Sequence, residues 1–114
     1  MEFPYVLGDV VLVEVRRLDG EGLIFYYKLM GTNIVSIDGF DLTNKTLEEL
    51  PELQYRERIR KTWTEVCETG EPAHYIRDVI LDDRIRRYEV LALPLASDGE
   101  EIDMLVTVQR QTSG

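Results

Sequence analysis

Residues 91–108, LALPLASDGEEIDMLVTV, place the strongest constraint on the fold. Two apolar runs flank an Asp98-Gly99 turn, which predicts a β-hairpin. Successive side chains of a strand point to opposite faces of a sheet, and both runs are hydrophobic at nearly every position. We therefore expect one face of this hairpin to pack against helices and the other face to need a cover of its own.

The hydrophobic period changes twice along the chain. Helical spacing of three and four predicts one long helix over residues 52–69, which ends at Gly70 and is preceded by shorter helical pieces. Alternation predicts strands on both sides of this helical part, at residues 10–18, 23–31, 74–81, 86–95 and 102–110. This order predicts an α+β fold in a single domain over residues 1–114.

Charge and composition limit the partners and the location. The chain has 13 basic and 22 acidic residues, a net charge of −9, which repels phosphate backbones and anionic lipids. We therefore expect no nucleic-acid partner and no membrane partner. No apolar run approaches the roughly 18 residues that span a bilayer, and no signal peptide is evident. The single cysteine suits a reducing compartment, so we expect a cytoplasmic protein.

The sequence contains no recognisable catalytic or metal-binding pattern. His74 and Cys67 are the only residues of their kinds, and their spacing is poor for zinc. The acidic pairs lie at predicted turns and helix starts, where carboxylates are solvated or interact with the helix dipole. There is no glycine-rich phosphate loop and no nucleophile motif. We expect no catalytic residue and no metal site, and hence no enzyme.

The order of the predicted elements and the amino-acid sequence of two stretches resemble a PAS sensor domain. The similarity is to a bacterial subgroup of PAS domains that often stand alone. These stretches are FYYKLMGTNIVSIDGFDLTNKTLEEL, from residue 25, and YEVLALPLASDGEEIDMLV, from residue 88. The resemblance implies a five-stranded antiparallel sheet, with short helices and one long helix inserted between strands 2 and 3. It also implies a cavity between sheet and helices. Some PAS domains hold haem, flavin, another chromophore or a small metabolite there, and others fill the space with side chains. Their output is usually a change in dimer geometry or in an attached effector.

The resemblance allows the cofactors of the family to be tested against this sequence. Haem-binding members generally supply a histidine from the long helix, but residues 52–69 contain none, and His74 lies beyond them. Flavin photosensors need a cysteine motif on the short helices, whereas Cys67 lies on the apolar stripe of the long helix. No cofactor is therefore evident. A noncovalent small-molecule pocket remains, with a predicted lining of Phe25, Tyr27, Ile34, Val35, Ile59, Trp63, Val90 and Met104.

Polar residues on the last two strands suggest which face is outward. Thr107 and Gln109 share one face with Asp103, so we expect that face of the last strand to be outward and Met104, Val106 and Val108 to face the helices. Glu89 marks the outer face of the preceding strand, with Tyr88, Val90 and Ala92 inward. The predicted outer face is an apolar stripe that would bind a second copy or a partner protein: Val10, Leu12, Leu91, Leu93, Leu95 and Leu105.

The sequence thus favours a sensory domain that binds a small molecule or a partner, and that signals through dimer or partner contacts by a shift between two packings. The alternative is an interaction or dimerisation module with a solid core and no ligand. A small cone-shaped α+β enzyme is a third possibility, but no acidic residue is expected on an inward face.

Overall fold

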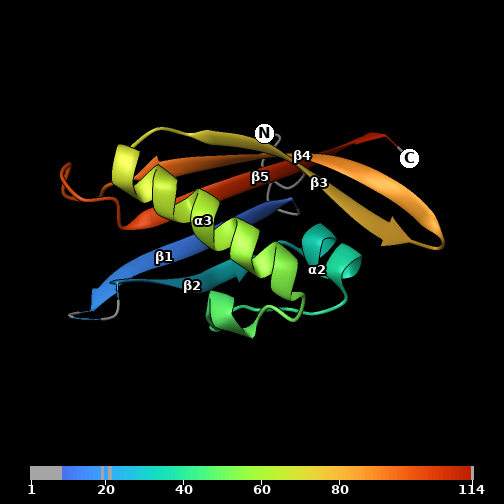
Figure 1. Ribbon diagram of the computed structural model, residues 1–114, viewed down its shortest axis with the longest axis horizontal. Coiled ribbons are helices and arrows are strands. Elements are labelled where there is room, and N and C mark those ends of the chain that lie inside the picture. Colours follow the sequence, from blue (N-terminus) through green and yellow to red (C-terminus); the bar gives the residue numbers. More distant parts are fainter. Residues whose placement is uncertain (1–8, 19, 21, 114) are drawn as a thin grey trace.

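The computed structural model describes residues 9–18, 20 and 22–113. The strands are β1 (Val10–Leu18), β2 (Gly22–Met30), β3 (Ala73–Leu81), β4 (Arg84–Leu95) and β5 (Met104–Ser113). Between β2 and β3 lie α2 (Thr32–Asp38), the 3₁₀ helix η1 (Leu47–Glu49) and α3 (Leu53–Thr69). The five strands form one antiparallel sheet in the order β2-β1-β5-β4-β3, and α3 lies across its front face (Figure 1). The predicted α+β fold is confirmed.

The ends of the elements follow from local chemistry. The Glu52 carboxylate accepts hydrogen bonds from the backbone N–H groups of Gln54 and Tyr55, and so caps the start of α3. The helix ends at Gly70, whose φ of 72° places it in the left-handed region that glycine tolerates. The predicted long helix is therefore confirmed to within one residue at its start.

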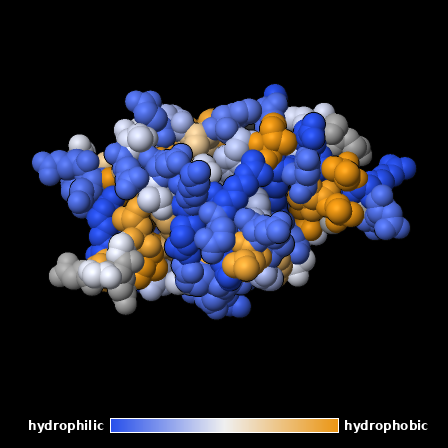
Figure 2. All heavy atoms as spheres, in the orientation of Figure 1, coloured by the Kyte–Doolittle hydropathy of each residue, from blue (hydrophilic) through white to orange (hydrophobic). Residues whose placement is uncertain are grey.

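The core lies between α3 and the inner face of the sheet, which is the face toward the helices. Ile59, Trp63 and Val66 form the buried stripe of α3. Trp63 packs edge-on against Phe25 of β2, with ring centroids 5.5 Å apart. Three other strands, β1, β4 and β5, contribute further buried residues of the core: Val11, Val13, Val15, Tyr88, Val90, Ala92 and Leu105. On the side that carries the helices, hydrophilic side chains cover most of the surface of α3 (Figure 2).

A β-bulge changes the alternation along β2. Simple alternation predicts that Leu29 points inward with Phe25 and Tyr27, and this prediction is wrong. The pairing of β1 with β2 shifts between Leu12 and Val13, so Leu29 pairs with Leu12 and is exposed, whereas Met30 is buried. The bulge thus turns Leu29 to the outer face.

The prediction for the two faces of β5 is also wrong. Leu105 is fully buried in the core, and Thr107 and Gln109 are buried on the same inner face. Met104 and Val106 face the other side, because their strand partners are Leu95 and Leu93. Thr107 and Gln109 misled the prediction, since they are polar residues that line an interior cavity and do not face water.

The prediction for β4 is confirmed. Tyr88, Val90 and Ala92 are buried on the inner face, and Leu91 and Leu95 are exposed on the outer face.

Among the described residues, no helix is long and apolar enough to cross a membrane.

Candidate functional site

A small cavity of about 30 Å³ lies inside the core. A cavity of this size accommodates about one water molecule. Part of its wall is apolar, as in any core. The rest is unusually polar for a core and consists of Tyr27, Asp38, Tyr55, Trp63, Tyr75, Arg77, Thr107 and Gln109.

The structure brings five of the eight predicted pocket residues to this cavity: Tyr27, Ile34, Ile59, Trp63 and Val90. Phe25 and Val35 belong to the surrounding core without lining the cavity. Met104 faces the other side of the sheet, for the reason given above, so its assignment to the pocket is wrong. A role of the remaining residues in ligand binding stays a prediction.

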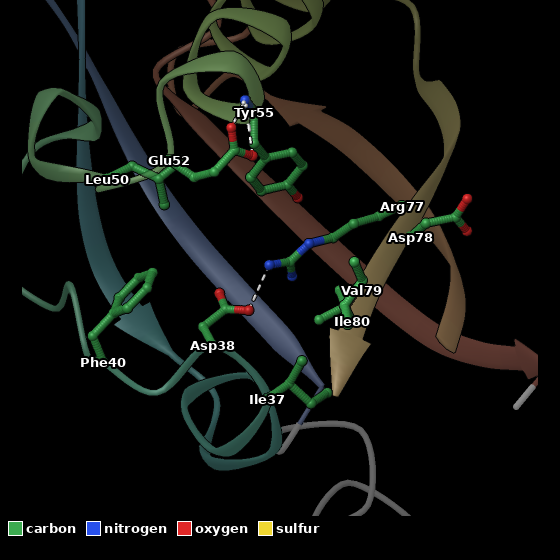
Figure 3. Close-up of a pocket in the computed structure, with 10 residues that line it drawn as sticks. All are labelled: Ile37, Asp38, Phe40, Leu50, Glu52, Tyr55, Arg77, Asp78, Val79 and Ile80. Atoms are coloured by element: carbon green, nitrogen blue, oxygen red, sulfur yellow. Dashed lines mark hydrogen bonds and ion pairs between the residues drawn. The ribbon is translucent and has the colours of Figure 1, made fainter. Parts of the chain in front are cut away.

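An open cleft of about 490 Å³ lies outside the cavity, between the end of α2, the start of α3 and β3 (Figure 3). Its lining is Ile37, Asp38, Phe40, Leu50, Glu52, Tyr55, Arg77, Asp78, Val79 and Ile80. Four of these residues, Asp38, Leu50, Tyr55 and Arg77, also line the inner cavity. They therefore form the wall between the cleft and the interior.

The centre of this wall is an ion pair between α2 and β3. Arg77 Nη2 donates to Asp38 Oδ1 at 2.5 Å, and the two side chains are only 11% and 5% exposed. The guanidinium carbon also lies 4.5 Å from the centre of the Tyr55 ring, in a cation–π arrangement. Figure 3 shows Arg77 reaching from β3 toward Asp38 across the cleft.

Burial and pairing act in opposite directions on these charges. Burial raises the pKa of Asp38 above its ordinary value, and the neighbouring Arg77 counteracts part of that rise. For Arg77, burial lowers the pKa, but Tyr55 and Asp38 outweigh that effect, and the net pKa is raised. Arg77 is therefore a charged group in a largely dehydrated wall.

Hydrogen-bond donors predominate around the inner cavity. Burial raises the pKa of Tyr27, Tyr55 and Tyr75, so all three keep their phenolic protons at neutral pH. Trp63 Nε1 and Gln109 Nε2 are buried and have no hydrogen-bond partner in the described part of the chain. The indole N–H of Trp63 lies close enough to Tyr75 to lower its pKa, but it does not complete a hydrogen bond.

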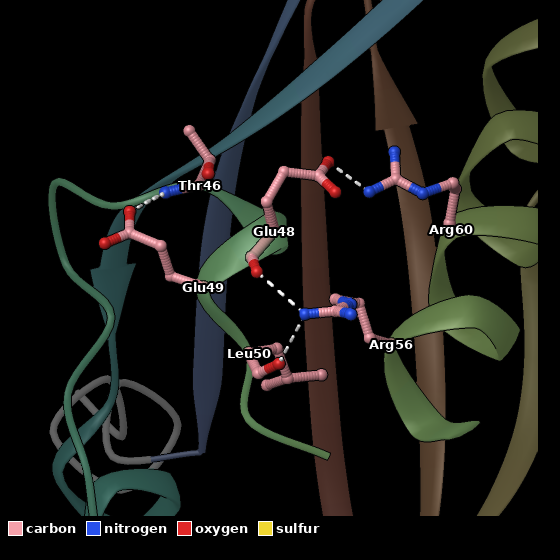
Figure 4. A network of polar contacts seen from close by, with 6 residues as sticks. All are labelled: Thr46, Glu48, Glu49, Leu50, Arg56 and Arg60. Carbon is pink, nitrogen blue, oxygen red and sulfur yellow. Dashed lines mark hydrogen bonds and ion pairs between the residues drawn. The ribbon is translucent and has the colours of Figure 1, made fainter. Parts of the chain in front are cut away.

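A polar network holds the wall in place from the side of η1 (Figure 4). Arg56 of α3 donates to the backbone carbonyls of Glu48 and Leu50, at 2.8 and 3.2 Å. Arg60 of α3 forms an ion pair with Glu48. These contacts fix η1 against α3, and so they position Leu50 beside the start of that helix, where it lines both the cleft and the cavity.

Sequence reasoning missed the ion pair. Alternation along β3 puts Tyr75, Arg77 and Val79 on one face, opposite the inward Val90 and Tyr88 of β4. A basic residue on an apolar face is a signal that could have identified Arg77. Asp38 lies 39 residues away at the end of a short helix, and local pattern contains nothing that pairs the two.

The histidine and the cysteine lie away from the cavity. His74 is exposed on the outer face of β3, with Nε2 3.5 Å from Glu89 Oε2. Burial raises the pKa of the Cys67 thiol to about 11, so it stays protonated at neutral pH, and it lines a separate hollow with Arg17 and Arg60. Within the described residues, no three His, Cys, Asp or Glu side chains gather in a possible metal site.

The outer face of the sheet carries a second candidate site, the outer patch. Strand pairing places eight apolar residues together there: Val10, Leu12, Leu91, Leu93, Leu95, Met104, Val106 and Val108. Leu91 and Leu95 are 39% and 48% exposed. All predicted outer-face residues except Leu105 therefore lie on this face, although whether it binds a partner stays a prediction.

Similarity to solved structures agrees with this architecture. The PAS domain of BvgS from Bordetella pertussis superposes with a TM-score of 0.70 at 15% identity, over 94% of this chain and 79% of that chain. A PAS domain from Colwellia psychrerythraea gives a TM-score of 0.66 at 14% identity, over 98% and 92%. A light-oxygen-voltage domain structure gives a TM-score of 0.60 at 12% identity, over 93% of this chain and 78% of that chain.

A comparison with curated proteins gives no match. The sequence itself matches the family described as "PAS fold" over residues 10–113, which is nearly the whole chain. The sheet order, the position of α3 and this match agree, and the chain belongs to the PAS family.

Proposed function

We propose that this PAS domain is a sensor that binds a small molecule in the cleft and responds through the packing of its helices on the sheet. The observation that carries the proposal is the position of the Asp38–Arg77 pair, in the wall that the cleft and the inner cavity share. A ligand in the cleft would meet α2, α3 and β3 at once. Binding energy can therefore bias the arrangement of three elements.

The helix α2 is the element best suited to respond. It has only seven residues, and it ends at Gly39, which has a left-handed φ of 84°. Its link to β3 is the Asp38–Arg77 pair. A ligand that competes for either charge would change that link, so the position of α2 would depend on ligand.

The proposed output surface is the outer patch, and its proposed partner is a second copy of the chain. The charged residues on the same face form pairs, Glu14 with Arg16, Asp78 with Arg87, and Glu89 with Arg110. Each pair is neutral, so a second copy can approach this face despite the net charge of −9. The single cysteine makes the cytoplasm the proposed location.

One observation favours the second candidate function, a ligand-free interaction module. The inner cavity holds only about 30 Å³ in the structure, so the core is nearly filled by side chains. In this case the outer patch alone would be functional, and the Asp38–Arg77 pair would serve only to hold α2 on the sheet.

Native mass spectrometry separates the two candidates. The protein is incubated with a small-molecule extract of bacterial cells and exchanged into volatile buffer. We expect a species heavier than the 13.2 kDa chain by the mass of one small molecule. The increment should disappear in Arg77→Met but persist in Arg87→Met, which removes an exposed arginine of β4. Detection of the bare chain alone would contradict the sensor and favour the solid-core module.

A further inference from the structure

The lining of the cavity and cleft identifies the chemical class of the ligand, an inference that rests on the proposed function. The relevant property is the set of hydrogen-bond donors in the wall, one of them cationic and others without a complete hydrogen bond. The inner wall offers the guanidinium of Arg77, the indole N–H of Trp63, the amide of Gln109, three tyrosine hydroxyls and the hydroxyl of Thr107. The hydroxyls and the Gln109 amide can also accept, so the Asp38 carboxylate is the only anionic acceptor among these groups, facing the cationic Arg77.

Two of these donors lack a partner although they are buried. Trp63 and Gln109 are 2% and 6% exposed; Gln109 Nε2 has no hydrogen-bond partner in the described part of the chain, and Trp63 Nε1 lies near the Tyr75 hydroxyl without completing a hydrogen bond. Leaving a buried donor unpaired costs about 1–3 kcal/mol, so an acceptor-bearing ligand gains from meeting such groups. The interior therefore favours a ligand group that accepts hydrogen bonds and carries negative charge.

Asp38 already supplies such a group from within the chain. Its carboxylate accepts from Arg77 at 2.5 Å, at the point where the cleft meets the cavity. The cavity behind it has room for about one water molecule, so a second carboxylate does not fit while Asp38 is in place. Entry of an anionic group requires that Asp38 leave.

The cleft determines what the rest of the ligand resembles. Most of its lining is apolar, from Ile37, Phe40, Leu50, Val79 and Ile80. Its two other acids are already engaged, Glu52 in capping α3 and Asp78 in an ion pair with Arg87. Both still add negative charge at the rim, which disfavours a second acidic group on the ligand.

We propose that the cleft binds a small monocarboxylic acid with an apolar body, whose carboxylate replaces that of Asp38 on Arg77. The planar guanidinium can bind a carboxylate in bidentate fashion, and Tyr55 already packs against its face. Asp38 acts as an internal competitor of the ligand. Its release frees the end of α2 from β3, which couples ligand binding to the movement of that helix.

The test uses hexanoate as the probe and Trp63 as the reporter. Trp63 is the only tryptophan of the chain and lies in the cavity wall, so its fluorescence reports binding directly. Hexanoate should give a saturable change, whereas hexan-1-ol, hexylamine and succinate should give none at the same concentrations. An equal response to hexan-1-ol, or a response to hexylamine alone, would overturn the assignment.

Asp38→Asn is the decisive variant. It removes the competitor, so the apparent Kd for hexanoate should fall by about tenfold or more. Glu101→Gln is the matched control, since it neutralises an exposed acid in the β4–β5 connection, outside the lining of the cleft and the cavity, and its Kd should stay within about twofold of the wild type. Unchanged or weaker binding by folded Asp38→Asn would contradict the proposal.

A second variant covers the case in which Asp38→Asn does not fold, because that change leaves Arg77 without its counter-ion. Arg77→Lys keeps the positive charge but loses the planar fork, and its Kd for hexanoate should rise by about tenfold. Binding of undiminished affinity by Arg77→Lys would overturn the proposal. A neutral or cationic molecule retained in native mass spectrometry, with no hexanoate response, would overturn this inference and leave the sensor function standing.

Discussion

Arg77 is the residue that most distinguishes this core from a plain apolar one. A buried ion pair is costly to dehydrate, and replacement of such a pair by apolar residues is often neutral or stabilising. The Asp38–Arg77 pair is therefore weak support for a purely structural role. A pocket that must present a charged donor to a ligand gives a direct reason for it.

Substitutions of Leu105 and Leu95 test which residues lie on the inner and outer faces of the sheet. Leu105 is fully buried and Leu95 is 48% exposed, whereas the sequence pattern alone predicts both on the outer face. Leu105→Ala should lower the free energy of unfolding by about 2–5 kcal/mol. Leu95→Ala should change it by no more than about 0.5 kcal/mol in dilute protein. Urea unfolding measures both, and equal losses would show that the assignment of faces is wrong.

Among the elements, the connection between β4 and β5 is held by hydrogen bonds to the carboxylates of Asp98 and Asp103. Asp103 Oδ1 accepts from the backbone N–H of Ser97 at 3.1 Å, and the Asp103 N–H donates to the Leu95 carbonyl at 3.0 Å. Asp103 thus closes both sides of the connection. Its hydrogen bonds from Ser97 lower the pKa of the carboxyl group below the ordinary value of 3.8.

This lowered pKa predicts an acid-dependent stability difference. A carboxyl group with a lower pKa in the folded state contributes stability above its unfolded pKa, and this contribution is lost as pH falls through the folded pKa. The wild type should therefore be more stable than Asp103→Ala at pH 7, with the gap narrowing below pH 3.8. Thermal melts from pH 7 to pH 2.5 provide the measurement. A gap that is constant over this range would contradict the role of the ionised carboxylate.

The helices and strands also show which parts of the fold can be predicted from the sequence pattern. Alternation of hydrophobic and polar residues identifies all five strands, and hydrophobic residues at spacings of three and four identify α3. Each of these patterns reflects burial within a single element. The pattern failed where burial depends on distant partners. Thr107 and Gln109 face a polar cavity that several elements build together, and the bulge opposite Leu12 depends on strand pairing. The Asp38–Arg77 pair joins segments 39 residues apart, beyond any local signal.

At the scale of the whole molecule, the sheet is apolar on both faces. The inner face packs against the helices, and on the opposite face the apolar outer patch includes the exposed Leu91 and Leu95, although its Val10 is buried. Exposed apolar patches on soluble domains mark contact surfaces, and a two-fold dimer brings one such patch against its own copy. The proposed sensor therefore combines a PAS sheet that responds to ligand on its inner face with self-association through its outer face.

Sedimentation velocity measures whether the outer patch joins two copies of the chain. The wild type should sediment with twice the mass of the 13.2 kDa chain, and Leu93→Glu should sediment as a single chain. Leu93 belongs to β4, lies within the outer patch and pairs with Val106 of β5. Ile85→Glu is the matched control at the β3–β4 turn, where Ile85 is 63% exposed, and it should leave the dimer intact. A wild type that sediments as a single chain at every concentration would contradict the claim.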